Sequence, residues 1–111
     1  NMNVQERLKY IETGKLPKKK KEIKGFDYDK IMKPGTVVNC DTEAKAKKLL
    51  KWAHSKEFKW GNDKSYLDDN RYYEYKKKTC YSLFEGFYGE LNFYKNNNYK
   101  VLKFEDVLIE E

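Results

Sequence analysis

Aromatic and cationic side chains alternate through the middle of this chain, and their types and spacing suit the binding of a planar anion. Residues 60–92 carry nine aromatic and five cationic side chains. A ring can stack on a base while a cation meets phosphate, and arginine offers a two-pronged contact. We expect rings to stack on the ligand, an arginine to bind its phosphate and an asparagine to contact a base edge. The predicted ligand-binding residues are Trp60, Arg71, Tyr75, Phe84 and Asn92.

The same rings have a purely structural interpretation, because a small domain with few aliphatic residues can use tyrosines to fill its core. For the whole set this interpretation is weaker. Tyr72 and Tyr73 are adjacent, and adjacent residues of a strand point to opposite faces. Both interpretations stay open for any single ring.

Residues typical of catalysis are scarce. A nucleophile usually needs a histidine as base, and the one histidine, His54, lies among lysines, where a structural or surface role is the simpler interpretation. Each pair of neighbouring carboxylates, Asp68–Asp69 and Glu105–Asp106, points in two directions and cannot act as an acid–base couple by itself. We therefore expect a protein that is not an enzyme, with no catalytic residues, metal site or cofactor.

Two cysteines, Cys40 and Cys80, are too few for a disulfide scaffold and lack the spacing of a zinc site. Both lie in apolar, strand-like segments. We expect them to be reduced and buried.

Composition limits the architecture to one small domain. The chain has 111 residues, of which 38% are charged and 16% aromatic, and the aromatic content argues against disorder. No apolar run approaches the roughly 18 residues of a membrane-spanning helix. We expect a cytoplasmic protein with no membrane partner.

Positive charge is concentrated near the N-terminus. Residues 1–35 hold ten Lys and Arg against five Asp and Glu, whereas residues 36–111 hold fourteen against thirteen. The centre of this excess is the lysine run at residues 18–21, which is either a solvated loop or an arm that attracts phosphates. The predicted organisation is a helical, lysine-rich arm and connector over residues 1–35, followed by a core domain over residues 36–111.

Local patterns predict the elements of both parts. The arm begins with a short helix from Asn3, and the connector holds one helical turn at residues 28–32. The strongest helix runs from residue 42 to 56, with apolar residues at 46, 49, 50 and 53. Strands are expected at residues 36–40, 57–60, 79–84, 91–94 and 99–104, with a tail at 107–109 that docks as a short helix or strand.

This order predicts an α+β fold, in which one helix packs on a small, mainly antiparallel sheet, preceded by the N-terminal helical arm. The tyrosine-dense stretch at residues 64–78 has no clean period, and we expect an ordered loop with helical turns there.

Four short segments carry a family resemblance: VNCDTEA at residues 38–44, FKW at 58–60, TCY at 79–81 and YKVLKFED at 99–106. With Leu49, Leu50 and Tyr75, they resemble small phage and prophage proteins of low-GC Gram-positive bacteria over roughly residues 37–108. Small phage proteins of this size often counter bacterial immunity. One such class, the Thoeris anti-defence sponges, sequesters cyclic ADP-ribose-type signals without cleaving them.

The residues and the resemblance together imply a phage-type counter-defence protein that sequesters a nucleotide-derived immune signal, either cyclic ADP-ribose-like or a cyclic nucleotide, in a homo-oligomer. One alternative is an inhibitor that docks on a bacterial defence complex or nuclease, as anti-CRISPR proteins do. Another is weak nucleic-acid binding through the lysines.

Overall fold

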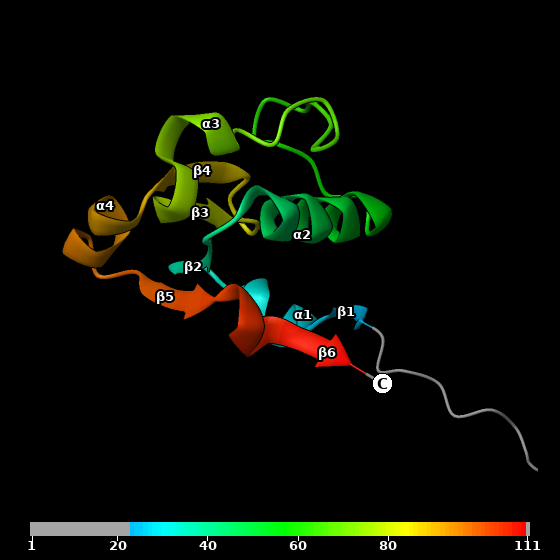
Figure 1. The fold of residues 1–111 in the computed structure, drawn as a ribbon, viewed down its shortest axis with the longest axis horizontal. Helices are drawn as coiled ribbons and strands as arrows, with labels where there is room; N and C mark the ends of the chain where they lie inside the picture. The colour runs from blue at the N-terminus through cyan, green and yellow to red at the C-terminus, as the bar shows by residue number, and fades with distance from the viewer. Residues whose placement is uncertain (1–22, 111) are drawn as a thin grey trace, which may run out of the picture.

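The computed structural model describes residues 23–110 and confirms an α+β fold (Figure 1). The predicted N-terminal helix and the lysine run lie outside the described residues. In chain order the elements are β1 (Ile23–Phe26), α1 (Tyr28–Ile31), β2 (Thr36–Cys40), α2 (Glu43–Ser55), α3 (Tyr72–Tyr75), the 3-10 helix η1 (Lys76–Lys78), β3 (Thr79–Ser82), β4 (Phe87–Glu90), α4 (Leu91–Asn96), β5 (Lys100–Lys103), the 3-10 helix η2 (Phe104–Val107) and β6 (Leu108–Glu110).

The strands form two sheets rather than the one that we expected. The larger sheet has the order β4-β3-β2-β5, and it is mixed: β3 pairs antiparallel with both β2 and β4, whereas β5 runs parallel to β2. The smaller sheet is an antiparallel pair of β1 and β6. Parallel pairing needs a long crossover, and here the chain between β2 and β5 supplies it with α2, the hairpin and α4.

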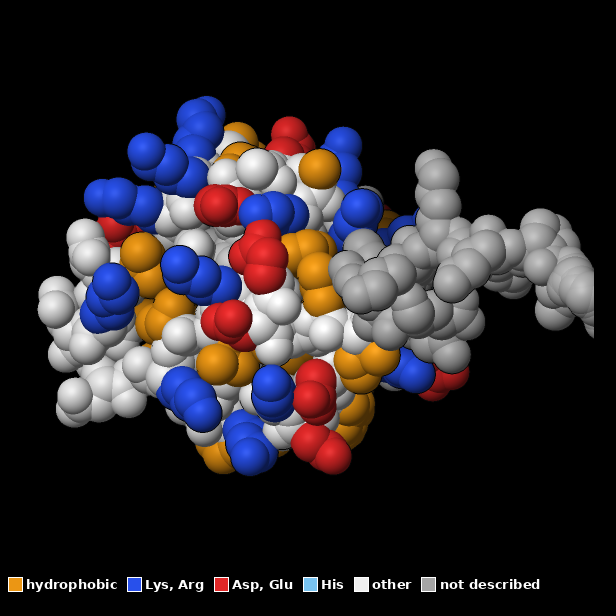
Figure 2. Space-filling model, turned by 60° about the horizontal axis from the view of Figure 1, so that its bottom comes forward, with side chains coloured by type: hydrophobic (Ala, Val, Ile, Leu, Met, Phe, Trp, Pro, Cys, Tyr) orange, Lys and Arg blue, Asp and Glu red, His pale blue; other side chains and the backbone are white. Residues whose placement is uncertain are grey.

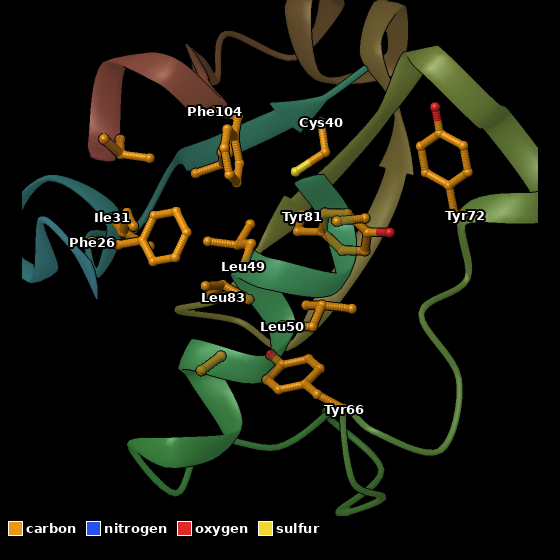
Figure 3. Packing of buried hydrophobic residues seen from close by; sticks show 14 residues of the cluster. Phe26, Ile31, Cys40, Leu49, Leu50, Tyr66, Tyr72, Tyr81, Leu83 and Phe104 are labelled. Carbon is orange, nitrogen blue, oxygen red and sulfur yellow. The ribbon is translucent and has the colours of Figure 1, made fainter. Parts of the chain in front are cut away.

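Helix α2 forms where its apolar spacing predicted it. The Thr42 side chain caps its N-terminus by accepting a hydrogen bond from the Lys45 backbone N–H at 3.2 Å. The four apolar positions of the stripe are fully buried: Ala46, Leu49, Leu50 and Ala53. They pack with Tyr81, Leu83 and Phe104 in the main core (Figure 3).

Two predicted strands are wrong. Residues 57–60 form a turn and irregular backbone, which Glu57 enters with a φ of +69°. Residues 91–94 belong to α4, because the Glu90 carboxylate accepts hydrogen bonds from the Asn92 and Phe93 backbone N–H groups and so caps a helix there. The side chain of Tyr94 from α4 then covers the far face of the sheet with Val37 and Cys80.

Most of the other local predictions agree with the structure. The strand predicted at 36–40 and the single turn α1 are confirmed, and the strands predicted at 79–84 and 99–104 form over the shorter spans 79–82 and 100–103. The tail forms β6. Cys40 and Cys80 are buried and free, as expected, and burial raises the pKa of both thiols, that of Cys80 to about 11.

Part of the expected connector is built into the core. Phe26 of β1 and Ile31 of α1 are buried in the main cluster. The Asp27 backbone N–H also donates to the Val107 carbonyl at 2.8 Å, which joins this segment to η2. No helix within residues 23–110 is long and apolar enough to cross a membrane.

Candidate functional site

A hollow of about 630 Å³ opens at the end of the β3–β4 hairpin, where three loop segments meet. This volume lies within the usual range of small-molecule sites. Its walls combine aromatic rings, two cations and two carboxylates. The lining residues are Trp60, Gly61, Asn62, Lys64, Asp68, Asp69, Arg71, Gly86, Phe87 and Tyr88.

Gly61 and Gly86 let the segment after Trp60 approach closely to the turn before β4. The Gly61 N–H donates to the Gly86 carbonyl at 2.9 Å. Gly86 has a φ of +78°, and a Cβ on it would lie 2.6 Å from the Gly61 nitrogen. Only glycine satisfies both the backbone angle and the contact, so this pair of glycines sets the shape of the hollow.

Trp60 is half-buried and contributes one wall. Its Nε1–H donates to the Asp69 carbonyl at 3.2 Å. Its ring packs edge-on against Tyr66 at 4.6 Å and Tyr88 at 5.8 Å between centroids. Because the ring is held from two sides and by its own N–H, it presents a rigid surface to the hollow.

Arg71 lies at the centre of a polar network. Its backbone has a φ of +58°, unusual for an arginine, and its backbone N–H donates to Asp69 Oδ1 at 2.8 Å. The guanidinium donates to Asp69 Oδ2 at 3.2 Å and to the Tyr88 hydroxyl at 2.6 Å. Tyr88 in turn donates to Glu74 Oε1 at 2.5 Å.

This network changes the role that we expect for Arg71. The hydrogen bond to Tyr88, with Asp69 as a further partner, raises the pKa of the guanidinium, and burial raises the pKa of the Tyr88 hydroxyl. The fork that was predicted to hold phosphate is therefore occupied by protein groups. Arg71 positions the ring of Tyr88, with its Cζ 4.9 Å from the ring centroid.

Three other lining side chains are available to contact a ligand in the hollow. The Phe87 ring is 58% exposed. The Lys64 ammonium and the Asp68 carboxylate form no ion pair with another residue of the described segment 23–110. A ring, a cation and an acceptor of hydroxyl hydrogen bonds thus surround one space.

The structure brings together two of the five predicted site residues, Trp60 and Arg71. Tyr75 packs against Tyr88, with 6.1 Å between the ring centroids, but does not line the hollow. Phe84 is half-exposed in the hairpin turn, and Asn92 lies on α4, where its Nδ2 donates to Glu90 at 3.4 Å.

Sequence reasoning did not single out Lys64, Phe87 or Tyr88, although all three belong to the alternating aromatic and cationic set. A second signal was available in Gly61 and Gly86. Each stands beside a ring, Trp60 or Phe87, and a glycine beside an aromatic residue in two separate segments is compatible with a close backbone approach.

Comparison with protein-family models, with curated proteins and with solved structures finds no match for this chain. Function is therefore argued from the hollow and its chemistry.

Proposed function

We propose that this protein is a non-enzymatic counter-defence protein that captures a nucleotide-derived immune signal, cyclic ADP-ribose-like or a cyclic nucleotide, in the hollow beside Trp60. The observation that carries the proposal is the combination, around about 630 Å³, of an exposed ring, Phe87, with a cation, Lys64, and a carboxylate, Asp68, neither of which is ion-paired within residues 23–110. Each group has a natural counterpart on a nucleotide.

The counterparts follow from ordinary recognition chemistry. A base stacks on Phe87 against the rigid wall of Trp60, a contact that depends on the π-face of the base. The Lys64 ammonium meets a phosphate as a point charge. The Asp68 carboxylate accepts hydrogen bonds from ribose hydroxyls.

Capture without cleavage agrees with the groups around the hollow. Asp69 accepts from Arg71, and the Arg71 guanidinium is held by Asp69 and Tyr88. The remaining acid, Asp68, has no histidine, serine or cysteine beside it among the lining residues. Ser65, whose carbonyl accepts from the Asp68 backbone N–H, has its Oγ 3.3 Å from His54 Nδ1, but neither residue of this Ser–His contact lines the hollow. The lining groups can hold a ligand, and none of them forms a nucleophile–base pair.

The rival proposal is docking on a defence protein or on nucleic acid through a basic face. Over the face drawn in Figure 2, Lys and Arg side chains are interspersed with Asp and Glu side chains. Such a mixed surface gives weaker attraction to a polyanion than a continuous basic stripe. This face therefore gives less support to basic docking than the hollow gives to capture.

Isothermal titration calorimetry with cyclic ADP-ribose, ADP-ribose and cyclic AMP tests the proposal. We expect binding of at least one of these ligands, and Phe87→Ala should weaken it about tenfold through the loss of one stacked base. Phe93→Ala is the matched control, because Phe93 is exposed to the same extent, 56% against 58%, and lies on α4 away from the hollow.

Two further measurements separate capture from its alternatives. Ligand released by heating the complex should have an unchanged mass, whereas an enzyme would return a product. Native mass spectrometry of the purified protein should report a homo-oligomer together with any co-purified ligand. Absence of binding to all three ligands and to cyclic di-AMP at millimolar concentration would contradict the proposal.

A further inference from the structure

A second hollow, of about 470 Å³, lies beside the first and shares Asp68 and Asp69 with it. The shared residues form a wall between the two spaces. In Figure 3 the chain before α3 leaves Tyr66, which lies against α2, and passes around the outside to Tyr72. The second hollow lies between this loop and the exposed side of α2, where Lys47 and Lys51 line it.

Arg71 connects the two hollows. Its guanidinium carbon lies 4.9 Å from the ring centroid of Tyr88 and 5.4 Å from that of Tyr73. Tyr88 lines the first hollow, and Tyr73 lines the second. One cation between two rings therefore holds a wall of each space in place.

The second hollow offers its own apolar surface. The side chains of Leu67 and Tyr73 are 58% and 59% exposed, and both line it. Exposed apolar groups at the rim of a hollow are typical of a binding site. The first hollow offers Phe87 in the same way, so each space has an aromatic ring that is open to a planar group.

Charge around the two hollows is nearly balanced. The cations are Lys47, Lys51, Lys64 and Arg71, and the carboxylates are Glu43, Asp68 and Asp69, which leaves one positive charge in excess. Lys47 and Lys51 are one helical turn apart and form no ion pair within the described part of the chain. Such a balance suits a ligand with one or two negative charges better than a triphosphate.

We infer that the two hollows form one bipartite site for a ligand with two ring-bearing halves joined through phosphate, that is, a ligand of the dinucleotide class. One base stacks on Phe87 in the first hollow, and the other lies against Tyr73 and Leu67 in the second. The Asp68 wall accepts hydrogen bonds from the sugar hydroxyls between them, and Lys51 and Lys64 approach the phosphates from either side. This inference rests on the proposed function and narrows its ligand class.

Calorimetry with four probes tests the inference. NAD and cyclic di-AMP carry two ring-bearing halves, AMP carries one, and ATP carries one with a higher charge. We expect at least one two-ring probe to bind about tenfold more tightly than AMP through a second stacked ring, and ATP to bind no more tightly than AMP. Two-ring probes that bind no more tightly than AMP would overturn the inference.

Paired variants locate the second half of the ligand. K47A/K51A should weaken the binding of the tighter two-ring probe roughly fivefold, since surface charge contacts contribute modestly. The affinity for AMP should stay within about twofold of the parent value. K48A/K56A is the matched control, because these lysines are also exposed and line neither hollow. Equal effects of the two double variants would overturn the bipartite site.

Failure of the inference can be told from failure of the proposed function. If AMP or cyclic ADP-ribose binds, Phe87→Ala weakens that binding and K47A/K51A does not change the affinity of any probe, the proposed function stands and the bipartite site does not. If neither ligand nor either two-ring probe binds at millimolar concentration, both fail.

Discussion

The two tryptophans lie in two regions where aromatic side chains have different surroundings. Trp52 packs edge-on against Phe26 at 5.4 Å, and Phe26 packs in the same way against Phe104. These rings contact one another and belong to or border the buried core. Around Trp60 the rings instead contact charged and hydrogen-bonded groups and border an open hollow.

The difference shows how a small domain can use aromatic residues for both stability and binding. Rings that pack mainly against other rings, as in the Trp52 region, contribute chiefly through burial. Rings that are fixed by polar partners, as Tyr88 is by Arg71 and Glu74, keep a defined orientation at the surface. The Trp52 region should therefore govern stability, and the Trp60 region should govern binding.

Phe104→Ala should have the largest effect on stability, because it removes a buried ring from the packing around Trp52. The Phe104 side chain is 4% exposed and its ring lies 5.4 Å from that of Phe26. Its removal should lower the free energy of unfolding by about 3–4 kcal/mol, measured by urea denaturation. Ligand affinity below the melting temperature should stay within about twofold of the parent; a large loss of affinity in the folded variant would mean that the two regions are not separate.

Gly86→Ala should break the Trp60 region. The new Cβ would meet the Gly61 nitrogen, at a φ that L-residues rarely adopt, and we expect a loss of about 3 kcal/mol together with weaker ligand binding. Gly35→Ala is the control, since Gly35 has a φ of +74° and open space around its Cβ position. It should cost only about 1 kcal/mol. Equal losses for the two variants would show that the contact with Gly61 is unimportant.

Two tyrosines beside Trp60 should respond differently to the loss of a hydroxyl. The Tyr81 hydroxyl donates to the Asn70 carbonyl at 2.5 Å, whereas the buried Tyr66 hydroxyl has no hydrogen-bond partner in the described structure. Tyr81→Phe should cost about 1 kcal/mol in urea denaturation, and Tyr66→Phe should be neutral or stabilising by a similar amount. A cost at Tyr66 as large as that at Tyr81 would mean that the Tyr66 hydroxyl does have a partner.

The smallest expected effect is a dependence on pH in the Trp52 region. Lys45 forms ion pairs with Asp41 and Glu105, and its hydrogen bonds hold the pKa of both carboxyls below their ordinary values of 3.8 and 4.5. Because the folded-state values are lowered, this contribution is complete above the ordinary values and is lost as pH falls through the folded ones. Lys45→Met should reduce the loss of melting temperature between pH 5 and about pH 3; an unchanged acid profile would assign the loss to other groups.

Local sequence patterns predicted the parts of this fold that depend on neighbouring residues. The stripe of α2 and the β-branched strand β2 are examples, because burial and propensity agree there. The β-like segment at 91–94 became helical because the side chain of Glu90 caps α4, an interaction that outweighs propensity over so short a segment.

The candidate site was only half predictable for a related reason. Composition identified Trp60 and Arg71, because aromatic and cationic residues concentrate in that part of the chain. The hollow depends on the contact between Gly61 and Gly86, and Phe87 and Lys64 come together only when that contact forms. Pairings between distant segments of this kind leave no periodic trace in a sequence.

The indole N–H signals of the two tryptophans test the central claim most directly. The chain has two tryptophans, one in each region, so a ¹⁵N-labelled sample should give two indole cross-peaks, assigned with Trp52→Phe. Titration with cyclic ADP-ribose, cyclic AMP and the two-ring probes should move the Trp60 signal progressively and leave the Trp52 signal in place. If both signals stay fixed with every probe at millimolar concentration, or if both move equally, the hollow is not the binding site that we propose.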